Sequence, residues 1–117
     1  MGYFGASTGG AAALIAAAEE RDKIQAVVSR GGRPDLAGES LPRVQAATLL
    51  IVGGNDPDVL ELNRIAFAKL RAKKQLEIVP GAGHLFEEPG TLGAVAALAG
   101  SWFLTHFKGE TFCPSRI

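Results

Sequence analysis

Apolar runs alternate along the chain with stretches of helical periodicity, which predicts an alternation of strands and helices. The clearest run, 47–52, is apolar at nearly every position without polar alternation, as is typical of a strand covered on both faces of a parallel sheet. Shorter runs over 3–6, 24–29 and 76–80 are also predicted to be strands. No linker, low-complexity tract or internal repeat separates them, so we expect a single α/β domain built on a four-stranded parallel sheet with flanking helices.

Helices are predicted after the first strand, after the third strand and after the fourth. The alanine-rich stretch 11–18 is a strong helix former. A second helix is predicted over 59–72 from the apolar positions Val59, Leu62, Ala66, Phe67 and Leu70. A third, ending near 107, is predicted from Leu92, Val95, Ala96, Ala99, Trp102 and Phe103. The segment 33–42 is predicted to be a loop.

Three residues with catalytic side-chain chemistry lie just past predicted strand ends. These are Ser7, Asp56 and His84. Because the carboxyl ends of parallel strands share one edge of the sheet, where such folds place their chemistry, we expect the three loops to converge.

Ser7 is the centre of a G-x-S-x-G sequence between a predicted strand and helix, where a sharp turn projects the serine hydroxyl. The simpler interpretation of this pattern is a glycine-rich turn with a capping serine. A serine nucleophile needs a general base, for which His84 is the candidate, and the imidazole needs an acceptor on its other nitrogen, for which Asp56 is the candidate. Asp58 is an alternative to Asp56, and either aspartate is equally interpretable as the N-cap of the helix that starts near 59.

Composition narrows the range of partners and sites. Twelve basic and 12 acidic residues give zero formal net charge, which argues against nucleic acid or anionic lipid as a main partner. The apolar stretch 11–18 is too short to span a bilayer. The single cysteine, Cys113, forms no internal disulfide, and no Cys/His cluster has zinc-ligand spacing, so we expect a cytoplasmic location and no metal or cofactor.

Four segments resemble a known family: GYFGASTGGAAA at 2–13, SRGGRPDLA at 29–37, LLIVGGND at 49–56 and PGAGHLFEEP at 80–89. Together they resemble the dienelactone-hydrolase-like branch of the α/β-hydrolase superfamily, in particular hydrolase domains sometimes fused to phosphoribosyltransferase domains. The resemblance implies a doubly wound hydrolase sheet with Ser7 as nucleophile, Asp56 as triad acid and His84 as triad base. It also implies an oxyanion hole that uses the backbone N–H of Thr8.

Two departures from the family limit what the resemblance implies. The short dienelactone hydrolases proper use a cysteine nucleophile, whereas this chain has Ser7, so dienelactone is not implied as the substrate. No paired-acid phosphoribosyl-pyrophosphate motif is present, so transferase activity does not carry over.

The chain begins at the strand of the nucleophile elbow, whereas a full-length family member has about four further strands before it. We therefore expect 1–110 to correspond to the C-terminal half of an α/β-hydrolase fold, with 111–117 as a tail. The absent part supplies the second oxyanion-hole N–H in this superfamily, and loss of one such donor costs about 3 kcal/mol in the transition state. Weak catalysis is the expected result unless the donor is replaced.

The first strand is expected to lie at a sheet edge, with Tyr3 and Phe4 on it and no lysine or proline to protect it. This predicts a homodimer, for which one geometry pairs the two first strands antiparallel across a two-fold axis.

Two functions follow from these observations. The first is a serine hydrolase acting on a small-molecule acyl substrate, specifically a carboxylic ester. The alternative is a catalytically weak half-hydrolase that acts as an oligomerising or interaction module and needs a partner for the missing strands.

The remaining polar candidates have structural interpretations. Arg30, Arg33 and Asp35 have two interpretations: they line the cleft and steer an anionic substrate, or they form a loop ion-pair cluster, which is the interpretation we favour. His106 is expected to interact with the C-terminal dipole of the last helix rather than to take part in catalysis.

Overall fold

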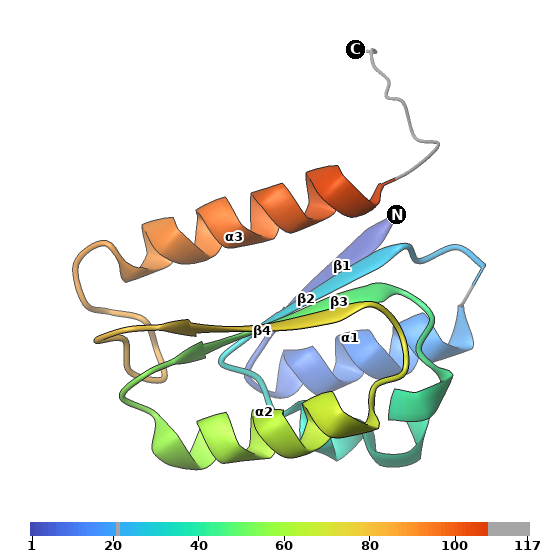
Figure 1. Ribbon diagram of the computed structural model, residues 1–117, viewed down its shortest axis with the longest axis horizontal. Coiled ribbons are helices and arrows are strands. Elements are labelled where there is room, and N and C mark those ends of the chain that lie inside the picture. Colours follow the sequence, from blue (N-terminus) through green and yellow to red (C-terminus); the bar gives the residue numbers. More distant parts are fainter. Residues whose placement is uncertain (21, 108–117) are drawn as a thin grey trace.

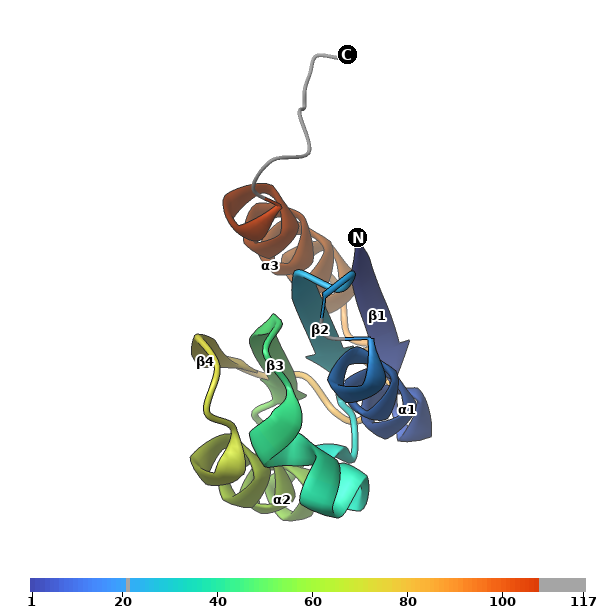
Figure 2. The same ribbon diagram turned by 90° about the vertical axis from the view of Figure 1, so that its right-hand side faces the viewer.

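The computed structural model describes residues 1–20 and 22–107 and contains one parallel sheet in the order β1-β2-β3-β4. The strands are β1 (Gly2–Ala6), β2 (Ala26–Arg30), β3 (Ala47–Gly53) and β4 (Lys74–Val79). Helix α3 (Thr91–His106) covers one face, and α1 (Thr8–Glu19), α2 (Pro57–Lys69) and the 3₁₀ segment η1 (Pro34–Arg43) lie on the other (Figures 1 and 2). The predicted fold class is confirmed.

The core consists of two apolar layers, one on each face of the sheet. All seven residues of β3 are buried, which explains the unbroken apolar run. Leu50 packs in the layer beneath α1 and α2, while Leu49 and Ile51 pack in the layer beneath α3. The indole N–H of Trp102 donates to the backbone oxygen of Ala47 at 3.0 Å, which anchors α3 to the start of β3.

Several boundaries differ from the prediction. Helix α1 begins at Thr8 rather than 11. Helix α2 begins at Pro57 rather than 59, because proline is well suited to the first helical turn. Helix α2 ends at Lys69 rather than 72. The ammonium group of Lys74 contacts this end and donates to the carbonyls of Phe67 and Leu70 at 2.7 and 3.0 Å. The predicted loop at 33–42 is largely the 3₁₀ segment η1.

The predicted apolar stripe of α3 is wrong at two positions. Leu92 is 56% exposed and Ala96 is exposed as well, whereas Ala94 and Leu98 are partly buried against the core. The predicted and the observed stripes share Val95, Ala99 and Trp102. The observed stripe also includes Ala94 and Leu98, which directly precede Val95 and Ala99, so α3 is rotated about its axis relative to the prediction. Spacing alone does not fix that rotation.

Strand β1 forms one edge of the sheet and pairs with β2 alone among the described strands. Phe4 on this strand is 50% exposed. Within 1–20 and 22–107, no helix is long and apolar enough to span a membrane. The predicted tail at 111–117, with Cys113 and the 110/111 boundary, lies outside the described residues.

Candidate active site

Ser7 occupies a sharp turn between β1 and α1. Its φ of 52° and ψ of −126° lie outside the regions that non-glycine residues favour. The turn is held by backbone hydrogen bonds: the carbonyl of Ser7 accepts from the N–H groups of Gly10 and Arg33, both at 3.1 Å, and the Ser7 N–H donates to the carbonyl of Arg30 at 3.3 Å. A strained residue fixed in this way is a common mark of a functional position.

The strain at Ser7 leads to a stability prediction. Glycine adopts a positive φ without steric cost, so Ser7→Gly is expected to raise the free energy of unfolding by about 1 kcal/mol, measured by urea denaturation. Ser101→Gly, in the middle of α3 where φ is helical, is the matched control and is expected to lower it by roughly 0.5 kcal/mol. Equal destabilisation by both substitutions would show that Ser7 is unstrained.

The side chains of Ser7, His84 and Asp56 form a hydrogen-bonded chain. Ser7 Oγ lies 3.1 Å from His84 Nε2, and His84 Nδ1 lies 3.0 Å from Asp56 Oδ2. These residues follow β1, β4 and β3, so the carboxyl edge of the sheet brings together positions that are 77 and 28 residues apart. The imidazole is 40% exposed and the carboxylate 17%, which leaves the imidazole open to solvent on one side.

Asp56 and Asp58 are distinguished by position. Asp56 stands at the N-cap position of α2, but its side chain makes no capping hydrogen bond and contacts His84 instead. Asp58 lies exposed in the first turn of α2, where a negative charge interacts favourably with the helix dipole. The carboxylate in contact with the imidazole is therefore that of Asp56.

The two loops that position Asp56 and His84 are tied to each other. The N–H of Asn55 donates to the carbonyl of Ala82 at 2.9 Å, and a Cβ added at Gly53 would lie 2.2 Å from that same carbonyl oxygen. Within the loop that contains His84, the N–H of Gly83 donates to the carboxylate of Glu88 at 3.1 Å. Glu88 was not among the candidates from sequence, and its only signal is its place in the segment at 80–89.

A buried polar cluster supports the Ser7 turn from below. The Asn63 side-chain amide donates to the carbonyls of Gly32 at 3.1 Å and Val59 at 2.8 Å, which links α2 to the loop after β2. The hydroxyl of Ser29 is fully buried between α1 and that loop, 2.3 and 2.2 Å from where a Cβ at Gly10 or Gly32 would lie. Asn63 was not predicted either, although a polar residue four positions after Val59, close to the apolar stripe, is the signal that identifies it.

This cluster makes Asn63 important for stability. Asn63→Leu removes the donor to Gly32 and leaves a buried carbonyl without its partner, so the free energy of unfolding is expected to fall by about 1–3 kcal/mol in urea denaturation. Asn55→Leu, at an exposed asparagine, is the control and is expected to change it by less than about 0.5 kcal/mol. A similar small effect at both positions would contradict the supporting role of Asn63.

Thr8, the predicted oxyanion-hole residue, is the first residue of α1. The first N–H groups of a helix have no intrahelical acceptor, and the positive end of the helix dipole favours negative charge there. The backbone N–H of Thr8 is therefore suited to bind an oxyanion beside Ser7.

The predicted ion-pair cluster forms only in part. The guanidinium group of Arg33 forms a bidentate ion pair with the Asp35 carboxylate, with N···O distances of 3.0 and 2.9 Å. These hydrogen bonds hold the pKa of the Asp35 carboxyl below its usual value. Arg30 instead lies 5.3 Å from the ring centre of Phe86 and donates to the carbonyl of Leu85 at 3.5 Å. The prediction that Arg30 belongs to this ion-pair cluster is wrong, because its side chain extends toward the loop that contains His84.

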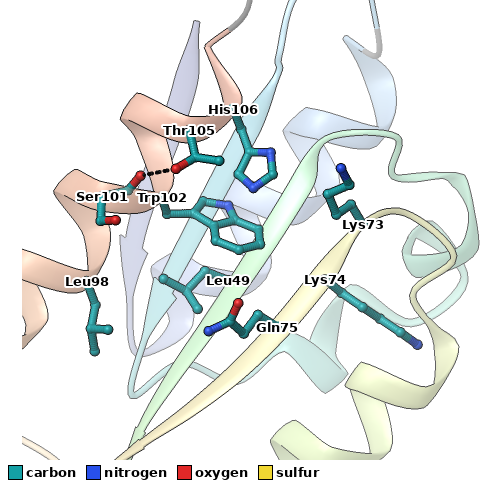
Figure 3. A pocket seen from close by; sticks show the side chains of 9 residues that line it. All are labelled: Leu49, Lys73, Lys74, Gln75, Leu98, Ser101, Trp102, Thr105 and His106. Carbon is teal, nitrogen blue, oxygen red and sulfur yellow. Dashed lines mark hydrogen bonds between the residues drawn. The ribbon is translucent and has the colours of Figure 1, made fainter.

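A cavity of about 310 Å³ lies away from this site, between the C-terminal half of α3 and the amino ends of β3 and β4 (Figure 3). Trp102 and Leu49 line it, and His106, the last residue of α3, lies beside Trp102 with ring centres 4.2 Å apart. The strands run from this end of the sheet toward Ser7, so His106 lies at the opposite end from His84. Within 1–20 and 22–107 there is no group of three or more side chains arranged to bind a metal ion.

Comparison with known proteins gives matches over nearly the whole chain. Residues 1–106 match the dienelactone hydrolase family. A putative phosphoribosyl transferase of Mycobacterium tuberculosis is 65% identical over 109 residues, which are 93% of this chain and 25% of that protein. This chain thus spans about a quarter of the length of that curated relative.

Solved structures give the same picture. A dienelactone hydrolase from Anabaena variabilis is 62% identical with a TM-score of 0.89, over 90% of this chain and 49% of that one. The esterase domain of a Rhodothermus marinus protein has a TM-score of 0.78 and 22% identity over 88% of this chain and 59% of that one. At this identity the match shows similarity of fold alone.

Proposed function

The chain belongs to the dienelactone hydrolase family, and from this premise we propose that it is a serine hydrolase that cleaves carboxylic esters. The observation that carries the proposal is the hydrogen-bonded chain Ser7–His84–Asp56 on a strained strand-to-helix turn. The family and the solved neighbours support an α/β-type hydrolase, and this geometry is what favours a serine nucleophile and an ester substrate.

In the proposed acylation step, Ser7 Oγ attacks the carbonyl carbon of the ester and its proton passes to His84 Nε2. The negative charge that develops on the carbonyl oxygen is stabilised by the Thr8 N–H. The tetrahedral intermediate then expels the alcohol, which takes the proton from Nε2, and the acyl group remains on Ser7. Asp56 accepts the Nδ1–H throughout, which fixes the tautomer and stabilises the imidazolium.

In the proposed deacylation step, a water molecule loses a proton to His84 Nε2 and attacks the acyl carbon. The second tetrahedral intermediate releases the carboxylic acid, and Ser7 regains its proton. The 40% exposure of the imidazole supports this step, because water reaches the base without displacing a side chain.

The substrate we propose is a small ester with an accessible acyl group. Phosphoribosyl transfer, which the name of the mycobacterial relative suggests for that protein, is not part of the proposal. The matched region is a quarter of that protein, and this chain lacks the paired-acid motif on which such transfer depends.

The alternative, an interaction module with weak or no catalysis, is favoured by the exposed edge strand β1. In that case the hydrogen bonds among Ser7, His84 and Asp56 are present without turnover.

Labelling with a fluorophosphonate tests the proposed function. The expected result is one phosphonyl group per chain, located on Ser7 by peptide mass spectrometry, and labelling slowed by about 10²-fold or more in His84→Ala because the general base is gone. Failure to label Ser7 in the folded protein would favour the interaction module.

A further inference from the structure

Arg30, the last residue of β2, contacts both the turn that contains Ser7 and the loop that contains His84. Its backbone carbonyl accepts a hydrogen bond from the Ser7 N–H at 3.3 Å. Its side chain extends toward the loop after β4, where Nη1 donates to the carbonyl of Leu85 at 3.5 Å. The guanidinium carbon lies 5.3 Å from the ring centre of Phe86. Leu85 and Phe86 directly follow His84, so one residue links the two turns.

The backbone around His84 forms a tight turn that depends on Phe86. The N–H of Phe86 donates to the carbonyl of Gly83 at 3.3 Å, which places His84 and Leu85 at the two central positions of the turn. Phe86 has a φ of 55°, and its ring is buried in the core layer beneath α3. A bulky residue keeps such a conformation only where its surroundings hold it. The orientation of the imidazole therefore depends on what holds Phe86 in place.

The side chain of Arg30 is suited to hold Phe86. A guanidinium group within about 6 Å of an aromatic ring centre is attracted by the negative face of the ring. The hydrogen bond to Leu85 fixes the same guanidinium group at the neighbouring residue. In the part of the chain that the structure describes, no carboxylate forms an ion pair with Arg30. The position of this side chain is therefore set by its contacts with the His84 loop.

Gly31, the next residue, brings the backbone of the same loop against His84. A Cβ at Gly31 would lie 3.1 Å from the carbonyl oxygen of His84 and 3.7 Å from its Nδ1. The N–H of Gly31 donates to the carbonyl of Ile51 at 2.7 Å, which ties this position to β3. The backbone after β2 is thus a fixed surface on one side of His84, against which Arg30 holds the turn.

We propose that Arg30 is a positioning residue for catalysis. Its carbonyl fixes the Ser7 turn and its side chain fixes the His84 turn, which keeps Ser7 Oγ and His84 Nε2 at 3.1 Å. Arg30 acts through Leu85 and Phe86 and touches no reacting atom. The inference rests on the proposed function, in which His84 transfers a proton in both steps, and proton transfer requires hydrogen-bond distance.

Steady-state hydrolysis of p-nitrophenyl acetate by Arg30→Met tests this role. Methionine keeps the backbone carbonyl that accepts from Ser7 but removes the charge and the side-chain donors. We expect kcat to fall about tenfold and KM to change by less than about twofold, because His84 acts in acylation and deacylation whereas a neutral ester gains nothing from the cation. Arg30→Lys keeps a cation near the ring and is expected to recover most of the lost kcat.

Arg64→Met is the matched control for Arg30→Met. Arg64 is exposed on α2, and its replacement is expected to leave both kcat and KM unchanged. Circular dichroism and urea denaturation of every variant check that each is folded under the conditions of the assay.

A double-mutant cycle with Phe86→Leu tests whether Arg30 acts through the aromatic ring. Leucine keeps an apolar side chain in the core but removes the ring face. In the Phe86→Leu background, Arg30→Met is expected to lower kcat by less than about threefold, because the contact that it removes is already absent. Equal losses in the two backgrounds would overturn the route through Phe86.

Proton NMR of the imidazole gives a readout that needs no turnover. The Nδ1–H of His84 that donates to Asp56 is expected to give a sharp downfield signal in the unsubstituted protein and in Arg64→Met. The chain has two histidines, so the signal is assigned by its loss in His84→Gln and its persistence in His106→Gln. In Arg30→Met the signal is expected to shift and broaden.

Three outcomes decide the inference. Unchanged kcat together with an unchanged His84 signal in Arg30→Met would overturn it. An effect confined to a higher KM for an anionic ester such as mono-p-nitrophenyl glutarate, with kcat for the neutral ester unchanged, would also overturn it and assign Arg30 to substrate binding. If no form of the protein hydrolyses esters but the His84 signal still responds to Arg30→Met, the positioning role stands and the proposed function fails.

Discussion

Ser7→Ala is expected to reduce kcat/KM for p-nitrophenyl butyrate by a factor of about 10³ or more. The substitution removes the only atom that the proposed mechanism uses to form the acyl-enzyme. The His84–Asp56 contact at 3.0 Å involves no atom of Ser7, so we expect it to persist. Alanine also keeps the backbone turn, and circular dichroism and urea denaturation are expected to show a folded protein. The measurement is the release of p-nitrophenolate at saturating and limiting ester concentrations.

Ser40→Ala is the matched control for Ser7→Ala. Ser40 lies on η1, and its hydroxyl accepts a long hydrogen bond of 3.5 Å from Arg43. This variant is expected to retain full activity. Equal rates in the unsubstituted protein, Ser7→Ala and Ser40→Ala would mean that the observed hydrolysis does not use Ser7, and the interaction module would become the better account.

Gly5→Ala is expected to lower the free energy of unfolding by about 3 kcal/mol or more, the largest effect on stability that we predict. A Cβ at this position would lie 2.2 Å from the carbonyl oxygen of Gly9, 2.5 Å from its carbonyl carbon and 2.8 Å from the nitrogen of Gly10. All three are backbone atoms in the first turn of α1, so the strain is relieved only by moving the helix away from β1. That movement also displaces the Ser7 turn, and activity is expected to fall with stability.

Gly9→Ala separates this clash from a general effect of glycine replacement. A Cβ at Gly9 meets nothing within 4 Å, and the position is helical, where alanine is favoured over glycine by about 1 kcal/mol. Urea denaturation is therefore expected to show Gly9→Ala as stable as the unsubstituted protein or more so. If Gly5→Ala unfolds at the same urea concentration as Gly9→Ala, the close packing of β1 against α1 is not a constraint on the turn.

The arrangement of strands and the convergence of three loops follow from the sequence because they depend on periodicity and topology. An unbroken apolar run at 47–52 requires cover on both faces, and parallel strands place their carboxyl ends together. Ser7, Asp56 and His84 are then neighbours whatever the details of packing. The choice between Asp56 and Asp58 depends on where α2 begins, and a start at Pro57 leaves Asp56 outside the helix with its carboxylate beside His84.

Features that depend on tertiary packing do not follow from the sequence. Asn63 is buried because its amide reaches the carbonyl of Gly32, which is 31 residues away, and no local pattern records that contact. The exposure of Leu92 depends on the rotation of α3 against the sheet. The 3₁₀ segment η1 includes a kink at Gly38, where φ is 50°, and such a turn leaves no hydrophobic periodicity to detect.

Trapping of the acyl-enzyme tests the central claim most directly, namely that Ser7 is acylated with the help of His84. The protein is mixed with p-nitrophenyl acetate, quenched in acid within the first turnover, and digested for mass spectrometry. The proposed mechanism predicts one acetyl group on the peptide that contains Ser7, and none on that peptide in Ser7→Ala or His84→Ala. Release of p-nitrophenolate without acetyl on Ser7, or acetyl groups spread over surface lysines at the same rate in all three proteins, would contradict it.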